Sequence, residues 1–191
     1  MSYKTLRLFV IWYRRLSIIL GVIIPILCYI SIPNISILND PLSRFGIEPD
    51  TKLIWIIFNQ MMCLSLLSIG IESNSHIISS YHRKVLNTLL YSSITCFSLS
   101  GFITMDIRYL HLTLAGLFFM LYIGYIFWYG IILRNIKVTI ISMILVSLCI
   151  LALFPTFMLP ISYGSFEVIF VSSIIIWNYI MIRYNDSKLK K

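Results

Sequence analysis

Charged residues are scarce in this chain of 191 residues: Asp, Glu, Lys and Arg together make up only 12% of it. An ordinary globular domain carries about 25% charged residues. Hydrophobic residues fill 59% of the positions, whereas a soluble domain of this length buries only about 70% of the surface that its unfolded chain exposes. This composition excludes a soluble globular fold, and lipid must solvate much of the chain.

Cysteine and histidine are also rare, which removes several kinds of site. The four cysteines lie singly inside apolar runs, so their spacing favours neither a disulfide framework nor a zinc site. Two of the three histidines, His76 and His82, fall in a polar loop, and the pair of intramembrane histidines that a haem needs is therefore missing. No P-loop, HExxH or GxSxG motif is present. We expect no cofactor and no bound metal.

Long apolar runs dominate what remains. They cover approximately residues 16–32, 53–71, 86–105, 110–133, 138–159 and 165–182. Each is close to the ~20 residues that a helix needs to cross the hydrocarbon core, whereas a transmembrane barrel would show alternating segments of about ten residues. The sequence predicts an all-α bundle of about six transmembrane helices in a single membrane domain, 1–191. The prolines at 155 and 160 leave a count of five or seven open.

Basic residues are distributed unevenly between the two predicted faces of the membrane. Twelve of the 15 fall on the face that holds both termini: Lys4, Arg7, Arg14, Arg15, Arg83, Lys84, Arg134, Lys137, Arg183, Lys188, Lys190 and Lys191. By the positive-inside rule this face is cytoplasmic. We expect these basic residues to interact with anionic lipid headgroups. We expect no nucleic-acid partner.

The longest predicted outer loop, residues 31–52, contains three prolines and several turn signals. Residues 42–47 within it are predicted to form either a short interfacial helix, which could act as a lid, or an ordinary connector between the first two spans. The other connections are short, so this loop is the main feature of the outer face.

Polar residues near the outer ends of the spans are the candidate site. Ionisable groups inside a membrane are costly and often mark function. Asn59, Asp106, His111 and Glu167 fall in the outer half of the predicted bundle, with Arg108 beside them. If the helices pack together, these groups converge on a cavity that opens away from the cytoplasm. Asn59 and Arg108 are candidates for ligand binding, and the other three for catalysis.

Each candidate also has a purely structural interpretation. Glu167 follows Ser165 closely and could complement the dipole of its helix. Asp106 could be an N-cap or pair with Arg108. His111 could bond a headgroup phosphate or a backbone carbonyl. Asn59 could form a helix–helix hydrogen bond.

Four short segments resemble a family of six-helix bacterial membrane proteins of unknown function. They are PLSRFGI at 41–47, IFN at 57–59, GFI at 101–103 and HLTLAGLFF at 111–119. That family is related to the DRAM autophagy modulators and the GPI-anchor lipid-remodelling proteins, and FE at 166–167 resembles a Phe-Glu pair of these eukaryotic relatives. The resemblance implies a six-helix bundle in the bacterial cytoplasmic membrane, with a site on the non-cytoplasmic side.

Three classes of function remain open. The protein binds or organises membrane lipids or a membrane protein partner, or it is an acyl hydrolase or transferase acting on outer-leaflet lipid. In the enzyme, His111 would be the acid and base, Asp106 or Glu167 would orient it, and Asn59 would donate to the oxyanion. A small-molecule or ion-coupled transporter is the third class.

Overall fold

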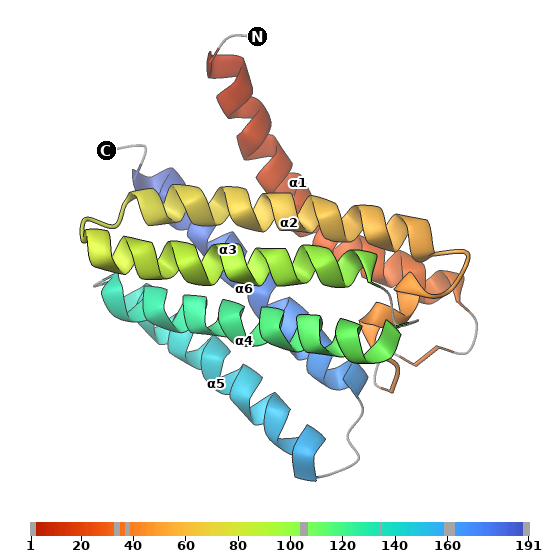
Figure 1. Ribbon diagram of the computed structural model, residues 1–191. Coiled ribbons are helices and arrows are strands. Elements are labelled where there is room, and N and C mark those ends of the chain that lie inside the picture. The colour runs from red at the N-terminus through yellow and green to blue at the C-terminus, as the bar shows by residue number, and fades with distance from the viewer. Residues whose placement is uncertain are drawn as a thin grey trace.

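A computed structural model describes residues 3–32, 35–36, 39–103, 107–133, 135–158 and 163–188, and this part of the chain is all-helical. Its elements are α1 (Tyr3–Ser31), the 3₁₀ helix η1 (Leu42–Gly46), α2 (Lys52–Ser75), α3 (Ser80–Phe102), α4 (Arg108–Ile132), α5 (Ile136–Met158) and α6 (Tyr163–Lys188) (Figure 1). The prediction of a six-helix membrane bundle is confirmed. Five helices are long and apolar enough to cross a membrane, and α5 has a shorter apolar part, Ile136–Ala152.

The helices extend beyond the apolar runs that predicted them. α1 begins at Tyr3 rather than near residue 16, and α6 continues to Lys188 rather than ending near residue 182. Apolar runs mark the part of a helix that lies in hydrocarbon, but backbone hydrogen bonding continues into the interface and can include charged residues. Arg14 and Arg15 are examples, because both lie within α1 and both form ion pairs.

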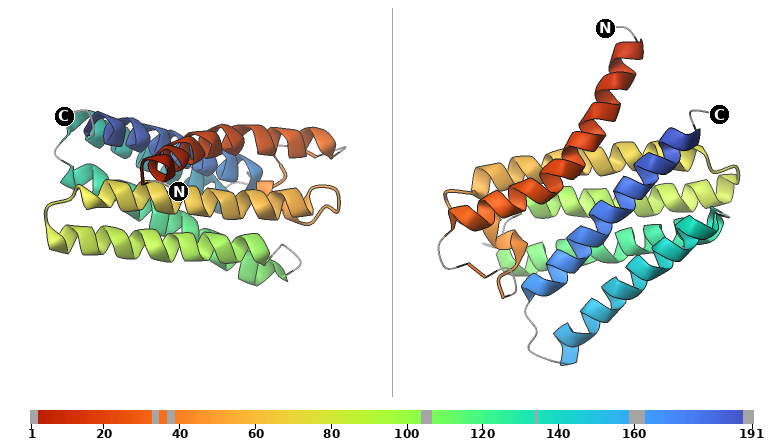
Figure 2. Two further views of the ribbon diagram at one scale, coloured as in Figure 1. Left: turned by 90° about the horizontal axis from the view of Figure 1, so that it is seen from above. Right: turned by 180° about the vertical axis from the view of Figure 1, so that it is seen from behind.

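Successive helices pack against each other, and α6 returns to contact α1 and α2, which closes the bundle. The connection at 76–79, the end of α4, the start of α5 and the end of α6 lie at one end, which we call the basic end. η1 lies at the opposite end, which we call the η1 end (Figures 1 and 2). The first part of α1 leaves the bundle and projects away from the other helices. α1 is therefore the least enclosed span, with 11% of its apolar window buried.

A column of three tyrosines on α4 ties the centre of the bundle together. Tyr122 donates to Asn178 Oδ1 (3.1 Å), Tyr125 donates to Asn74 Oδ1 (3.1 Å), and Tyr129 donates to the Ser73 carbonyl (2.8 Å). Residues 122, 125 and 129 are spaced by three and four, so they share one face of the helix. These hydrogen bonds fix α4 against α6 and α2, and they use polar groups that would otherwise be costly inside the bundle.

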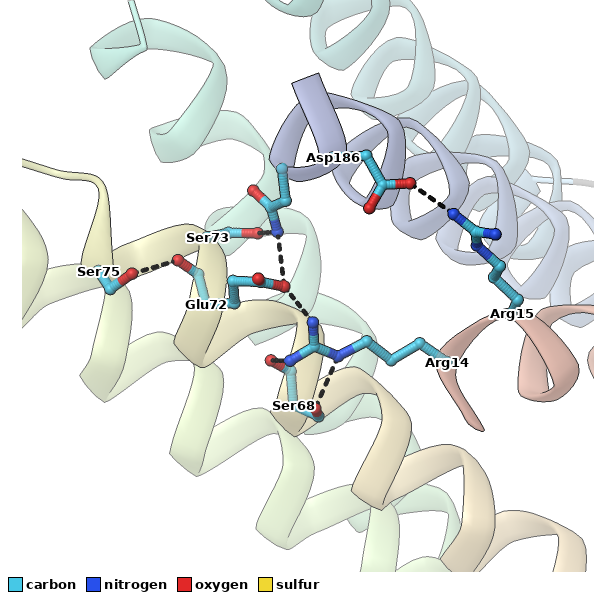
Figure 3. Close-up of polar contacts among 8 residues, drawn as sticks. Arg14, Arg15, Ser68, Glu72, Ser73, Ser75 and Asp186 are labelled. Atoms are coloured by element: carbon cyan, nitrogen blue, oxygen red, sulfur yellow. Dashed lines mark hydrogen bonds and ion pairs between the residues drawn. The ribbon is translucent and has the colours of Figure 1, made fainter. Parts of the chain in front are cut away.

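Charged and amide groups join α1, α2 and α6 at the basic end (Figure 3). Arg14 forms an ion pair with Glu72 and donates from Nε to Ser68 Oγ at 2.7 Å. Asn185 on α6 donates to Ser73 Oγ at 3.0 Å. Arg15 pairs separately with Asp186, also on α6, at 2.8 Å. The twin arginines of α1 therefore anchor it to two different helices.

Candidate ligand cavity

A cavity of about 80 Å³ lies inside the bundle toward the η1 end. Helices α1, α2, α3, α4 and α6 form its walls, and η1 contributes Leu42 and Ser43. The wall is mainly apolar, with residues Gly21, Pro25, Leu42, Trp55, Phe58, Met62, Leu66, Phe97, Ala115, Phe118, Phe119, Val171, Ile174 and Ile175. Five polar side chains also line it: Ser43, Asn59, Ser100, His111 and Glu167. We call this space the polar cavity.

The structure brings three of the five predicted site residues together. Asn59, His111 and Glu167 come from α2, α4 and α6, and all three line the polar cavity. Arg108, the first residue of α4, is exposed and is not among the cavity residues. Asp106 lies outside the described residues. Three of the predicted polar residues therefore converge on one cavity from three separate helices.

Glu167 binds η1 instead of the start of its own helix. The dipole interpretation placed Glu167 in the first turn of its helix. Because α6 begins at Tyr163, Glu167 lies beyond that turn. Its side chain accepts hydrogen bonds from the Ser43 backbone N–H (3.2 Å) and from Ser43 Oγ (3.3 Å). The residue is 8% exposed. Glu167 therefore fastens the 3₁₀ helix over the cavity while it presents carboxyl oxygen to the interior.

His111 bonds backbone carbonyls rather than a carboxylate. Its Nδ1 lies 2.7 Å from the Ile103 oxygen and 3.1 Å from the Ser100 oxygen, at the end of α3. Because carbonyl oxygens only accept, Nδ1 carries the proton. In the neutral ring Nε2 is then a hydrogen-bond acceptor. A hydrogen bond from His111 to a backbone carbonyl was one of the structural alternatives considered from the sequence. The structure shows this bond, and His111 also lines the cavity.

Asn59 is the polar residue of the cavity whose side-chain amide has no hydrogen-bond partner among the described residues. It is 6% exposed, yet its side chain forms no hydrogen bond with any residue that the structure describes. Gly101 lies against it: a β-carbon at Gly101 would be 3.1 Å from Asn59 Cβ. A buried amide without partners loses free energy unless a ligand or water bonds it. The helix–helix hydrogen bond considered for Asn59 is therefore absent among the described residues.

Sequence reasoning missed Ser43 and Ser100. Serine is frequent in apolar helices because its hydroxyl can bond the preceding turn, and Ser100 does so by donating to the Phe97 carbonyl at 2.8 Å. No sequence pattern separates it from other serines. Gln60 shows the reverse case, since it adjoins Asn59 but pairs with Ser98 Oγ at 2.7 Å on α3 and stays outside the polar cavity.

A second cavity of about 190 Å³ adjoins the first between α1 and α6. We call it the lateral cavity. It shares five lining residues with the polar cavity: Gly21, Pro25, Leu42, Val171 and Ile175. Its remaining lining is almost wholly apolar and includes Val22 and Ile26, which are 50% and 49% exposed on the outside of the bundle. The lateral cavity therefore lies beside the polar cavity and is bordered on its other side by residues on the outside of the bundle.

Ion pairs hold the loop that carries η1. Arg44 contacts Asp40 Oδ1 at 2.6 Å and Glu48 Oε1 at 3.2 Å. The backbone N–H of Ser36 and the guanidinium of Arg44 lower the pKa of the Asp40 carboxyl below its ordinary value. Arg44 itself is not a cavity residue, and among the described residues that line the polar cavity none is a lysine or an arginine.

Within the described part of the chain, no group of three His, Cys, Asp or Glu side chains is placed to hold a metal ion. No protein-family model, curated protein or solved structure matches this chain.

Proposed function

We propose that this integral membrane protein binds a membrane lipid, with the polar end of the lipid in the polar cavity and an acyl chain in the lateral cavity. The adjacency of the two cavities carries the proposal, because five residues line both. An amphipathic ligand needs polar groups at one end of its site and apolar surface along the rest. Ligand sites of this kind are mainly apolar with a few convergent polar groups.

The hydrogen bonds of the serines support binding rather than serine-based hydrolysis. In a catalytic triad the serine donates to a histidine, and a carboxylate orients that histidine. Ser43 Oγ donates to Glu167 at 3.3 Å, and Ser100 Oγ donates to the Phe97 carbonyl. His111 is bonded through Nδ1 to backbone carbonyls. The arrangement of the described residues thus resembles a recognition site more closely than a catalytic triad.

The charge pattern supports an orientation with both termini in the cytoplasm and the η1 end on the opposite side. The basic end carries Arg14, Arg15, Arg83, Lys84, Lys137 and Arg183. Cytoplasmic ends of membrane helices carry such an excess. In this orientation the polar cavity lies in the outer half of the membrane, and the lateral cavity gives the outer leaflet access to it.

Gly21 offers a direct test, because it lines both cavities. A β-carbon there would lie 3.2 Å from Ile175 Cδ1, so a leucine would fill space where the two cavities adjoin and would block the proposed passage between them. Purified protein in nanodiscs would be photolabelled with a lipid that carries a diazirine on its acyl chain. We expect label on α1 and α6 in the natural protein and its loss in Gly21→Leu.

Gly116→Leu is the matched control, since no atom lies within 4 Å of a β-carbon at Gly116. This variant should label like the natural protein. Val171→Phe provides a second block of the passage through a half-buried residue. Monodisperse gel filtration shows that each variant is folded. Equal labelling of α1 and α6 in folded Gly21→Leu and Val171→Phe would refute the proposed path.

A further inference from the structure

We infer that the lipid headgroup is an uncharged, hydroxyl-bearing group of glycerol size rather than a phosphate or a carboxylate. This inference rests on the proposed function and specifies which lipid the cavity selects. It follows from the balance of hydrogen-bond donors and acceptors that the described side chains present to the ligand.

Acceptors outnumber donors in the polar cavity. Glu167 contributes carboxyl oxygens, His111 contributes Nε2 in its neutral tautomer, and Asn59 contributes an amide oxygen. The hydroxyls of Ser43 and Ser100 already donate to Glu167 and to the Phe97 carbonyl. The Asn59 amide N–H₂ is therefore the main side-chain donor left for a ligand. A ligand with two neighbouring hydroxyls satisfies several acceptors at once and accepts from Asn59.

An anionic headgroup lacks partners in this cavity. Phosphate and carboxylate groups are bound in proteins by Arg, by Lys and by clusters of N–H donors. None of the described residues that line the polar cavity is an arginine or a lysine.

Size points to the same ligand class. The polar cavity measures about 80 Å³, and a cavity of about 10–15 Å³ by the same measure holds one water molecule. The space therefore accommodates a small head of several non-hydrogen atoms, such as glycerol. A monoacylglycerol meets both conditions, with its acyl chain in the lateral cavity.

Competition among lipids of one chain length tests the inference. Protein in nanodiscs would be photolabelled as above in the presence of 1-monooleoylglycerol, oleate or oleoyl lysophosphatidate at neutral pH. We expect monooleoylglycerol to compete at a concentration about tenfold lower than either anion, which is the preference that two hydrogen bonds of ordinary net strength provide. Equal or better competition by an anionic lipid would overturn the inference.

Two neighbouring amides provide the control variants. Asn59→Leu removes the open amide of the polar cavity, so monooleoylglycerol should then compete only at a concentration about threefold to tenfold higher. Gln60→Leu removes an amide that pairs with Ser98 outside the cavity and should leave the competition by monooleoylglycerol unchanged. Undiminished competition by monooleoylglycerol in folded Asn59→Leu would also overturn the inference. If the photolipid labels neither α1 nor α6 in the natural protein, the proposed function itself fails, and this result differs from labelling with another headgroup preference.

Discussion

Arg14 and Arg15 are adjacent in α1 but lie in different environments. The Arg14 side chain is 12% exposed and contacts Glu72 and Ser68, whereas the Arg15 side chain is 51% exposed and contacts Asp186. Removing one partner of an enclosed ion pair leaves the other charge without compensation, whereas exposed ion pairs contribute at most about 1 kcal/mol. Comparing substitutions of the two arginines therefore shows how much the burial of an ion pair, rather than the ion pair alone, contributes to stability.

We predict that Arg14→Met lowers the free energy of unfolding by about 2–4 kcal/mol, because Glu72 loses its main partner. Arg15→Met should lower it by less than about 1 kcal/mol. Denaturant unfolding in mixed micelles measures both changes. A double variant, Arg14→Met with Glu72→Met, should recover part of the loss. Similar losses for the two arginines would show that the Arg14 network does not stabilise the bundle.

At this scale the sequence revealed some site residues and concealed others. Asn59, His111 and Glu167 were predictable because amide, imidazole and carboxyl groups are expensive in apolar spans and therefore conspicuous. Ser43 and Ser100 were not, because nothing in a serine's local sequence shows whether it faces a cavity. The bonding of Glu167 to Ser43 joins residues 124 positions apart, and only the packed bundle shows this contact.

Two glycines on α4 illustrate how close contact fixes the positions of helices. A β-carbon at Gly130 would lie 2.6 Å from Ser142 Cβ on α5, and Ser142 is fully buried and cannot move aside. Gly116 on the same helix faces open space. The absence of a side chain at Gly130 therefore allows α4 and α5 to approach each other, as small residues do between membrane helices.

We predict that Gly130→Ala destabilises the bundle by about 1–3 kcal/mol, because the added methyl group forces α4 and α5 apart. Gly116→Ala should leave stability unchanged or raise it by up to about 1 kcal/mol, since alanine favours the helix. The apparent unfolding temperature in detergent, followed by circular dichroism, distinguishes the two. An equal effect of both substitutions would contradict the close α4–α5 contact.

The η1 loop should respond to acid through Asp40. Its lowered pKa means that the ionised carboxyl stabilises the loop above the ordinary aspartate pKa of about 3.9. That contribution is lost as the pH falls through the lower folded-state pKa. Trp55 reports on the loop, because its ring packs edge-on against Phe45 of η1 with centroids 5.2 Å apart.

We predict that Trp55 fluorescence is constant between about pH 7 and pH 5 and changes below about pH 4, as Asp40 is protonated. Asp40→Asn should show the changed emission already at neutral pH. Subtracting the spectrum of Trp55→Phe isolates this signal from the other three tryptophans. An emission that stays constant to pH 2 in the natural protein would exclude Asp40 as the group that secures η1.

Across the whole molecule, hydropathy was sufficient to predict six helices and their order, because lipid imposes both a length and an apolar surface on each span. It did not predict that α1 and α6 pack together, since helix pairing depends on specific contacts such as Arg15–Asp186. The extra length of α1 and α6 was also missed, because polar residues at the basic end are paired inside the helices rather than terminating them.

The orientation yields a prediction about labelling from the two sides of the membrane. In a background with the four cysteines replaced by alanine, Asp50→Cys lies at the η1 end and Ser79→Cys at the basic end, and both positions are exposed. In right-side-out vesicles an impermeant maleimide should modify Asp50→Cys directly and Ser79→Cys only after permeabilisation. The opposite pattern would reverse the proposed topology and place the cavity toward the cytoplasm.

The contact of α6 with α1, α2 and η1 also determines when, during synthesis, the polar cavity can form. α6 is synthesised after the other five helices, yet it supplies Glu167, the group that fastens η1 over the cavity, and one wall of the lateral cavity. A nascent chain that has inserted only α1 to α5 has neither this fastening nor this wall. The polar cavity is therefore completed only after α6 has been made and has met α1.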